Sequence, residues 1–381
     1  ADYSKEAEVL LAKAVKLDPA NVDAWNCLGN CFWKKKDYVG ARDCFVGAIG
    51  QAKNAASLRS LSMVLRQIGE TPQDRAANIT ESVSRAKEAI TLDVTDEESW
   101  YVLGNAYLTM FFSQSHDTSD LTQAMKAYSR ADETGMSRNP DLHFNRGMVF
   151  KFQEDYTQAV AAFQAALAID PSLPAEDEID DITRHVTRVA KLVEKGGGVK
   201  PKVLAALVAS MPGADVRERL AASKKKSDAK GTEASAGGAG GAEAKEGETK
   251  EAAAGPSPEF AKLSELSDGL NPGKWILLKQ VAQALRTGQT PQCLVMVDED
   301  GALVSVSLYH AGESACDRFD NKRDTFIVCD PVVKTVTLDR EDGSSVSYKT
   351  LQVLHPHNFS VNGRTLSGQY AHAGLKVVNL S

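Results

Sequence analysis

Several side chains in the N-terminal part of the chain have the chemistry to bind an extended peptide. Asparagine amides hydrogen-bond a peptide backbone, arginine guanidinium groups bind carboxylates through two parallel bonds, and an aspartate can hold a basic side chain. The candidate residues are Asn26, Asn30, Arg59, Met63, Arg66, Tyr101, Asn105, Asp141 and Asn145. Their types predict recognition through hydrogen bonds and ion pairs.

No recognisable catalytic motif accompanies these candidates. The sequence lacks a P-loop, a nucleophile elbow and a glycine-rich dinucleotide motif between a strand and a helix. Cys27 and Cys31 lie one helical turn apart, but no second cysteine or histidine pair has a matching spacing, so we interpret both as core residues. His355 and His357 flank a proline and are typical of a surface loop. We expect no enzymatic activity, no metal site and no cofactor.

The candidates lie in a stretch that repeats itself. The segment WNCLGNCF, Trp25–Phe32, returns as WYVLGNAY, Trp100–Tyr107, and a third copy contains Gly147. Each copy continues with alanine-x3-aromatic-x2-alanine, which together with the first segment is the pattern of a tetratricopeptide repeat. Glycine and alanine let two antiparallel helices approach closely, and the aromatics fill the gap to the next pair. The pattern predicts an α-solenoid.

The first helix of each such repeat lines a concave groove, and the candidates fall at fixed offsets from its aromatic position. Asn30 and Asn105 occupy the same offset in two copies, and Asp141 lies two residues before the aromatic position of another. A merely solvated helix face is the alternative, because polar residues cover any exposed helix. Recurrent asparagine with Arg59 and Arg66 between the copies favours a peptide groove.

The rest of the chain indicates a domain organisation in three parts. Residues 1–220 form the solenoid with capping helices, and residues 260–381 form a small antiparallel β-barrel resembling an oligonucleotide/oligosaccharide-binding fold. Residues 221–259 contain no large apolar or aromatic side chain, so we expect a disordered linker. Two repeats hold extra residues, 70–78 and 111–120, which we expect to form loops.

The expected barrel has a period-two pattern with turn signals at Asp300-Gly301, Asp342-Gly343 and Asn362-Gly363. Basic and acidic residues are nearly balanced in this part, and the hairpin tip at residues 298–300 is acidic. A barrel that binds nucleic acid is therefore disfavoured, because such a surface needs a basic groove. The expected strands are 275–285, 293–297, 303–309, 325–329, 332–338, 345–354, 359–361 and 375–378.

The composition is that of an ordinary globular protein. The 381 residues carry a net charge of −7, which argues against a polyanion-binding surface over the whole molecule. No stretch approaches the roughly 20 consecutive apolar residues of a membrane-spanning helix, and the start shows no secretory signal. We expect a cytoplasmic or nuclear protein with no membrane contact.

Residues 1–195 resemble the tetratricopeptide repeat protein five family through DYSKEAEVLLAKAVKLDP, SLSMVLRQ, SWYVLGNAYL and NPDLHFNR. The C-terminal part resembles the barrel of that family through VDEDGALVSVSLYH and YKTLQVLHPHNFSVNGR. The resemblance implies a non-enzymatic adaptor that recognises the Met-Arg-Glu start of nascent tubulin at the ribosome and triggers decay of tubulin mRNA. It also implies a pairing in which Asp141 holds the peptide arginine and Arg66 its glutamate, while Asn26, Asn30 and Asn105 hold the backbone.

Three functions follow from the residues and the resemblance together. The first is the nascent-tubulin adaptor, with the ribosome and an mRNA-decay adaptor as partners and with nucleic-acid contact only through the ribosome. The second is a stress-responsive nuclear coactivator scaffold that binds a histone acetyltransferase. The third, disfavoured, is a barrel that binds single-stranded nucleic acid. The first two can coexist, so we expect the protein in cytoplasm and nucleus.

Overall fold

The computed structural model describes residues 3–115, 117–235, 259–284, 291–309, 319–320, 323–340 and 342–365. These residues divide into two compact units. Residues up to 150 and 158–176 belong to the first unit, and residues 151–157 and those from 177 onward belong to the second. Each unit has its own clusters of buried apolar side chains.

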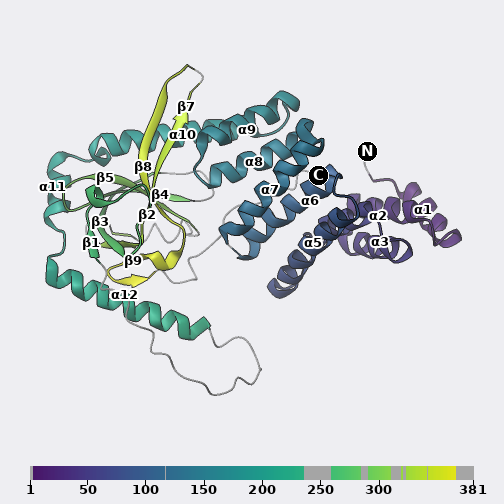
Figure 1. Ribbon diagram of the computed structural model, residues 1–381, viewed down its shortest axis with the longest axis horizontal. Helices are drawn as coiled ribbons and strands as arrows, with labels where there is room; N and C mark the ends of the chain where they lie inside the picture. Colours follow the sequence, from purple (N-terminus) through teal and green to yellow (C-terminus); the bar gives the residue numbers. More distant parts are fainter. Residues whose placement is uncertain are drawn as a thin grey trace. The chain divides into compact units, whose positions relative to one another are not determined.

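The first unit consists of antiparallel helix pairs, as the repeat pattern predicts (Figure 1). Polar side chains cap the helix starts, since Asn21, Asp37 and Asn54 each accept a hydrogen bond from a backbone N–H in the first turn. The helices are α1 (Lys5–Leu17), α2 (Val22–Lys34), α3 (Tyr38–Gln51), α4 (Ala55–Leu65), α5 (Pro72–Leu92), α6 (Glu97–Met110), α7 (Thr118–Thr134), α8 (Pro140–Phe152) and α9 (Tyr156–Ile169).

The recurring glycine has a steric reason in each of three helix pairs. A Cβ atom on Gly29 would lie 2.6 Å from a ring carbon of Phe45, and one on Gly104 would lie 2.4 Å from a ring carbon of Tyr128. Gly147 stands in the same relation to Phe163, at 2.7 Å. The aromatic ring of the second helix therefore packs directly on the backbone of the first. This confirms the close approach of helices expected from the repeat.

We expect the Gly104→Ala substitution to lower the free energy of unfolding of the first unit by about 2 kcal/mol, because the added methyl group overpacks the buried Tyr128 ring. Gly50→Ala is the matched control, since a Cβ atom at this helical position meets nothing within 4 Å. There alanine should add up to about 1 kcal/mol through its helix propensity. Urea unfolding followed by circular dichroism measures both, and equal changes would contradict the steric explanation.

The two insertions are helical where loops were expected, so that expectation was wrong. Residues from Pro72 onward belong to α5, which begins with a capping box between Thr71 and Asp74. Residues 111–115 continue α6 as a π-helical turn, and Phe111 and Phe112 are buried there. Capping chemistry and buried phenylalanines thus turn the extra residues into longer helices.

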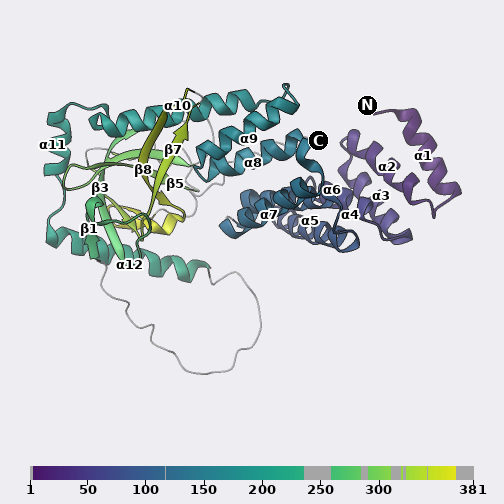
Figure 2. The same cartoon turned by 45° about the horizontal axis from the view of Figure 1, so that its top comes forward.

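The second unit consists of a β-sheet and the helices α10 (Ala175–Glu194), α11 (Pro201–Ala209) and α12 (Ala214–Ser235). Helix α11 contacts β3, and α12 contacts β10 (Figures 1 and 2). The strand order is β10-β9-β6-β3-β4-β5-β8-β7-β2, with β1 paired to β3. The strands are β1 (Glu259–Ala261), β2 (Gly269–Leu270), β3 (Lys274–Gln283), β4 (Gln292–Val297), β5 (Leu303–Leu308), β6 (Phe326–Cys329), β7 (Val332–Asp339), β8 (Ser345–Val353), β9 (Phe359–Val361) and β10 (Arg364–Thr365).

The sheet differs in one respect from the expected antiparallel barrel. The pairs β5–β8 and β1–β3 are parallel, while the remaining pairs are antiparallel. A parallel pair requires a long connection, and the segment from β5 to β8 runs through β6 and β7 before it returns. The expected strand at 375–378 lies outside the described residues.

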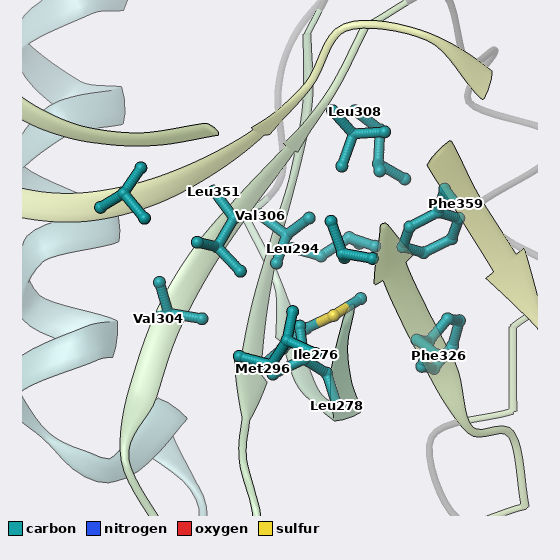
Figure 3. Packing of buried hydrophobic residues seen from close by; sticks show 13 residues of the cluster. Ile276, Leu278, Leu294, Met296, Val304, Val306, Leu308, Phe326, Leu351 and Phe359 are labelled. Carbon is teal, nitrogen blue, oxygen red and sulfur yellow. The ribbon is translucent and has the colours of Figure 1, made fainter. Parts of the chain in front are cut away.

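The core of the second unit lies on one face of the curved sheet. Alternate residues of β3, β4 and β5 converge there with Phe326 and Phe359, and Figure 3 shows these side chains pointing toward one another. Ile276, Leu294 and Val306 are fully buried in this cluster. The period-two pattern read from the sequence is therefore the inward face of the sheet.

The expected boundaries at residues 220 and 221 need a correction. Helix α12 runs to Ser235, so residues 221–235 are helical, whereas residues 236–258 lie outside the described part. Ala221 packs in a cluster with Trp275 of β3, and the ammonium group of Lys224 lies 5.7 Å from the centre of the same ring. The methylene groups of a lysine can cover apolar surface while its ammonium group lies over an aromatic ring. Composition alone therefore did not show that this segment packs on the sheet.

The expected capping helices also belong with the sheet. Leu207 of α11 packs in one buried cluster with Val281 and Val297 of the strands. Helix α11 therefore covers part of the sheet, and α10 from residue 177 onward falls into the same unit. Among the described helices, none is long and apolar enough to cross a membrane.

Candidate functional site

Five of the nine candidates come together at one place in the first unit. The polar cluster, as we call it, consists of Arg66, Tyr101, Asn105, Asp141 and Asn145 together with Tyr128. Helix α6 supplies Tyr101 and Asn105 one turn apart, and α8 supplies Asp141 and Asn145 with the same spacing. Residues four apart share a helix face, which is why two helices can place two polar groups each on one surface.

The amide of Asn105 is the centre of the hydrogen bonding in this cluster. Its Oδ1 atom accepts a hydrogen bond from the Tyr128 hydroxyl at 2.7 Å and another from Nδ2 of Asn145 at 3.0 Å. The backbone carbonyl of Asn105 accepts a hydrogen bond from Thr109 Oγ1 at 2.8 Å, and Arg66 Nη1 approaches the same hydroxyl at 3.5 Å. The cluster is thus a connected network between α4, α6, α7 and α8.

Arg66 follows the last residue of α4 and carries a charge that the described residues do not neutralise. Its Nε atom is buried with no hydrogen-bond partner, and among the described residues no carboxylate lies within ion-pair distance of its guanidinium group. Burial lowers the pKa of Arg66 below its ordinary value, although the neighbouring Tyr128 and Tyr101 act in the opposite direction. A buried, uncompensated cation is costly and attracts an anion.

Asp141 is a partly buried carboxylate without a cation, as Arg66 is a buried cation without a carboxylate among the described residues. Burial raises the pKa of its carboxyl group, and the charge of Asp170 raises it further. Within the part of the chain that the structure describes, no lysine, arginine or histidine pairs with this carboxylate. Burial raises the pKa of Tyr101, and the charge of Asp141 raises it further. The cluster therefore holds one cation and one anion that are both partly desolvated.

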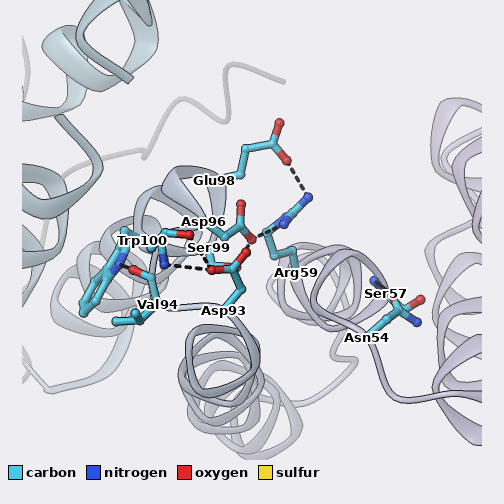
Figure 4. Close-up of polar contacts among 10 residues, drawn as sticks. Asn54, Ser57, Arg59, Asp93, Val94, Asp96, Glu98, Ser99 and Trp100 are labelled. Atoms are coloured by element: carbon cyan, nitrogen blue, oxygen red, sulfur yellow. Dashed lines mark hydrogen bonds and ion pairs between the residues drawn. The ribbon is translucent and has the colours of Figure 1, made fainter. Parts of the chain in front are cut away.

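Arg59 lies outside the polar cluster because other groups of the chain engage it. Its guanidinium group pairs with Asp96 through Nη1 and with Glu98 through Nη2, the latter at 2.6 Å (Figure 4). Asp96 also accepts a hydrogen bond from Ser99. The arginine thus links α4 to the start of α6, and its charge is compensated within the repeat unit.

Asn26, Asn30 and Met63 complete the candidate set. Asn26 accepts a hydrogen bond from Ser57 Oγ at 2.7 Å, and Asn30 is exposed. No contact joins either asparagine to the polar cluster among the described residues. Met63 is partly buried and packs in the same apolar cluster as Tyr101. Met63 therefore supports the wall beside Tyr101, whereas the two asparagines belong to an earlier repeat.

Sequence reasoning missed two members of the network, Tyr128 and Thr109. Tyr128 occupies the aromatic position of a second helix, where the other copies have Phe45 and Phe163. The extra hydroxyl at this position was the available signal, since a buried tyrosine hydroxyl needs a hydrogen-bond partner. Thr109 bonds within its own helix and gave no signal.

The described residues contain no group of three histidine, cysteine, aspartate or glutamate side chains that could hold a metal ion. His355 and His357 are exposed and stack with ring centres 5.2 Å apart. Cys27 is exposed, so its interpretation as a core residue was wrong, whereas Cys31 is partly buried. The helix turns Cys27 outward, because the buried face of α2 is formed by Ala24, Leu28 and Gly29.

The helix pairs, the glycine–aromatic packing and the sheet define a tetratricopeptide-repeat protein with an additional β domain. Tetratricopeptide-repeat models match residues 4–56 and 140–173, and the model of the tetratricopeptide repeat protein 5 OB fold domain matches residues 257–374.

Relatives are similar over nearly the whole chain. Tetratricopeptide repeat protein 5 of Mus musculus is 34% identical over 373 residues, which cover 95% of this chain and 77% of the relative. The proteins of that name from Homo sapiens and Bos taurus are 33% and 32% identical with the same coverage. The chain belongs to the tetratricopeptide repeat protein 5 family, and its repeats and OB-type domain support an adaptor-type role in protein binding.

Proposed function

We propose that this protein is a non-enzymatic adaptor whose polar cluster binds a short peptide carrying an arginine and a glutamate, as at the start of nascent tubulin. One observation carries the proposal. Among the described residues, Arg66 is buried without a carboxylate, and Asp141 of the same polar cluster is partly buried with a raised pKa and no cation. A peptide of the opposite charge pattern would compensate both groups at once.

The energetic argument follows from desolvation. Folding has already removed part of the water from Arg66 and Asp141, so the cost of burying these charges is met before the ligand arrives. A peptide carboxylate at Arg66 and a guanidinium group at Asp141 then gain attraction in a region of low dielectric. Pre-organised charges of this kind favour selective recognition of one ligand pattern.

In the cell this binding would report the appearance of a nascent tubulin chain at the ribosome. The adaptor would then recruit an mRNA-decay factor, with no cofactor and no membrane contact, and its nucleic-acid contact would come only through the ribosome. This role places the protein in the cytoplasm. A second pool in the nucleus, acting as a transcription coactivator scaffold, is compatible with it.

The test is a titration of the full chain with a fluorescent Met-Arg-Glu-Ile peptide, compared with peptides in which alanine replaces arginine or glutamine replaces glutamate. We expect the Arg66→Met variant to lose about 30-fold or more in affinity for the first peptide, the cost of breaking a desolvated charge pair. It should discriminate little between the glutamate and glutamine peptides.

Arg59→Met is the matched control, because Asp96 and Glu98 already engage the Arg59 guanidinium group. This variant should keep its affinity within about threefold. Equal losses in both variants would place the ligand elsewhere on the repeats. If the folded full chain binds none of the peptides, the nascent-tubulin proposal fails and the coactivator scaffold becomes the better proposal.

A further inference from the structure

The Asn105 side chain has no acceptor capacity left for a ligand. An amide oxygen has two lone pairs, and the Tyr128 hydroxyl and Asn145 Nδ2 occupy both of them in Asn105. With Asn145 donating through Nδ2 and the Tyr128 hydroxyl also donating, the reverse orientation of the Asn105 amide would turn its Nδ2 toward two donors. The two hydrogen bonds therefore hold the orientation of the Asn105 amide. An asparagine side chain usually offers an acceptor and two donors, but here only its N–H groups can bind a ligand.

Tyr128 is the residue that makes this arrangement special among the repeats. In the equivalent positions, Phe45 and Phe163 pack on Gly29 and Gly147 as the Tyr128 ring packs on Gly104. The hydroxyl adds nothing to that packing, since phenylalanine suffices twice. It is fully buried, and a buried hydroxyl must find a partner, which in this repeat is Asn105.

Asn30 shows what happens without the hydroxyl. It occupies the position in α2 that Asn105 occupies in α6, but its aromatic neighbour across the helix pair is Phe45, which cannot donate. The Asn30 side chain is exposed, whereas Asn105 is partly buried in the network. The same repeat position is thus free to turn in one copy and fixed in another.

The groups around Asn105 also offer donors. Arg66 has only donors, and the amides of Asn105 and Asn145 lie close enough to the Tyr101 hydroxyl to oppose the rise in its pKa that burial causes. Asp141, when ionised, has only acceptors. The polar cluster thus offers donors at Arg66 and Asn105 and acceptors at Asp141.

We propose that Tyr128 is a positioning residue that holds Asn105 as a hydrogen-bond donor, and that Asn105 donates to a backbone carbonyl of the bound peptide beside the carboxylate bound by Arg66. This inference rests on the proposed function. It defines the ligand more narrowly, as an extended segment that turns a carbonyl oxygen toward Asn105 of α6, its carboxylate toward Arg66 and its cation toward Asp141.

A double-mutant cycle on the affinity of the full chain for the Met-Arg-Glu-Ile peptide tests the inference. Tyr128→Phe should weaken binding about fivefold, the value of one neutral hydrogen bond, because Asn105 then loses one of the two hydrogen bonds that hold its amide. Asn105→Ala should weaken it by at least as much. In the Asn105→Ala background, Tyr128→Phe should have no further effect, since its only route to the ligand is gone.

Controls separate positioning from general stability. Tyr128→Phe is expected to fold, because phenylalanine fills the same position in two other repeats. The same cycle with Asn145→Ala in place of Tyr128→Phe provides a second measurement, because Asn145 is the other donor to Asn105.

Each outcome has a distinct meaning. Wild-type affinity in Tyr128→Phe, or losses that add in the double variant, would overturn the positioning role while the proposed function stands. A wild-type chain that binds no peptide would overturn both. Loss of affinity in both single variants without any further loss in the double variant would support the inference, provided that the melting temperatures remain comparable.

Discussion

Asp141→Lys should abolish binding of the Met-Arg-Glu-Ile peptide while the repeats remain folded. The substitution places a cation where the peptide arginine would lie and adds a second positive charge to a cluster that already contains Arg66. Like charges in a partly desolvated place repel strongly, so we expect an affinity at least 100-fold weaker. Fluorescence anisotropy measures the affinity, and circular dichroism verifies the fold.

Asp23→Lys is the matched control for this result. Asp23 occupies the same repeat offset in α2 that Asp141 occupies in α8, and it is exposed. The control changes the net charge by the same amount at an equivalent position, so it accounts for any general electrostatic effect on a basic peptide. A loss of equal size in both variants would show that charge at a distance, and not a specific pair at Asp141, governs binding.

The pH dependence provides an independent check on Asp141. Burial raises the pKa of the free carboxyl group, and a bound guanidinium group would lower it again. Protonation then competes with the peptide, so affinity should be constant at neutral pH and fall as the pH drops through the raised pKa. With the glutamine peptide, which has no glutamate carboxylate to titrate, the fall should begin at a higher pH than for an ordinary aspartate, and Asp141→Asn should remove it.

Part of the site could be predicted because helix geometry fixes the direction of a side chain. Tyr101, Asn105 and Asp141 were placed on one surface by their offsets in the repeat, with Asn145 close by, and the structure brings the four side chains together. The position of a long side chain in the repeat does not show whether another residue of the chain already forms an ion pair with it. Arg59 and Arg66 lie seven residues apart on one helix face, yet the first reaches Asp96 and Glu98 while the second meets no carboxylate among the described residues.

In the fold, too, the features that follow from local sequence patterns could be predicted, whereas a feature that depends on a distant contact could not. The glycine–aromatic spacing predicted the helix pairs, and period-two alternation predicted most strands, because both patterns report burial of a face. The end of the helical region did not follow from composition. Helix α12 continues past residue 221 because Ala221 and Lys224 meet Trp275, a contact partner more than fifty residues away in the sequence.

Glu154 is the position at which we expect the largest loss of stability in the second unit. This residue, in the turn between α8 and α9, is 1% exposed and lies at φ 57°. Its carboxylate accepts hydrogen bonds from Ser307 at 2.6 Å, from Tyr309 at 2.9 Å and from Gln352 at 2.9 Å. The turn, residues 151–157, is thereby fastened to β5 and β8 of the same unit.

Glu154→Ala should lower the free energy of unfolding of the second unit by about 3–5 kcal/mol, since it leaves buried donors without their shared acceptor. Glu154→Gln should cost less, because one amide oxygen can still accept. Urea unfolding measures the loss in free energy of unfolding. Hydrogen exchange of the β5 and β8 amides shows whether these two strands are the ones destabilised.

Lys36→Ala separates the hydrogen bonds of Glu154 from its backbone conformation. Lys36 occupies the corresponding turn between α2 and α3 with φ 63°, and its side chain is exposed. Both alanine variants keep a Cβ atom at positive φ, so any strain is common to them and cancels in the comparison. We expect Lys36→Ala to change stability by no more than about 0.5 kcal/mol. If Glu154→Ala were equally mild, water would be replacing the carboxylate at β5 and β8, and the turn would depend on its apolar contacts for its attachment to the sheet.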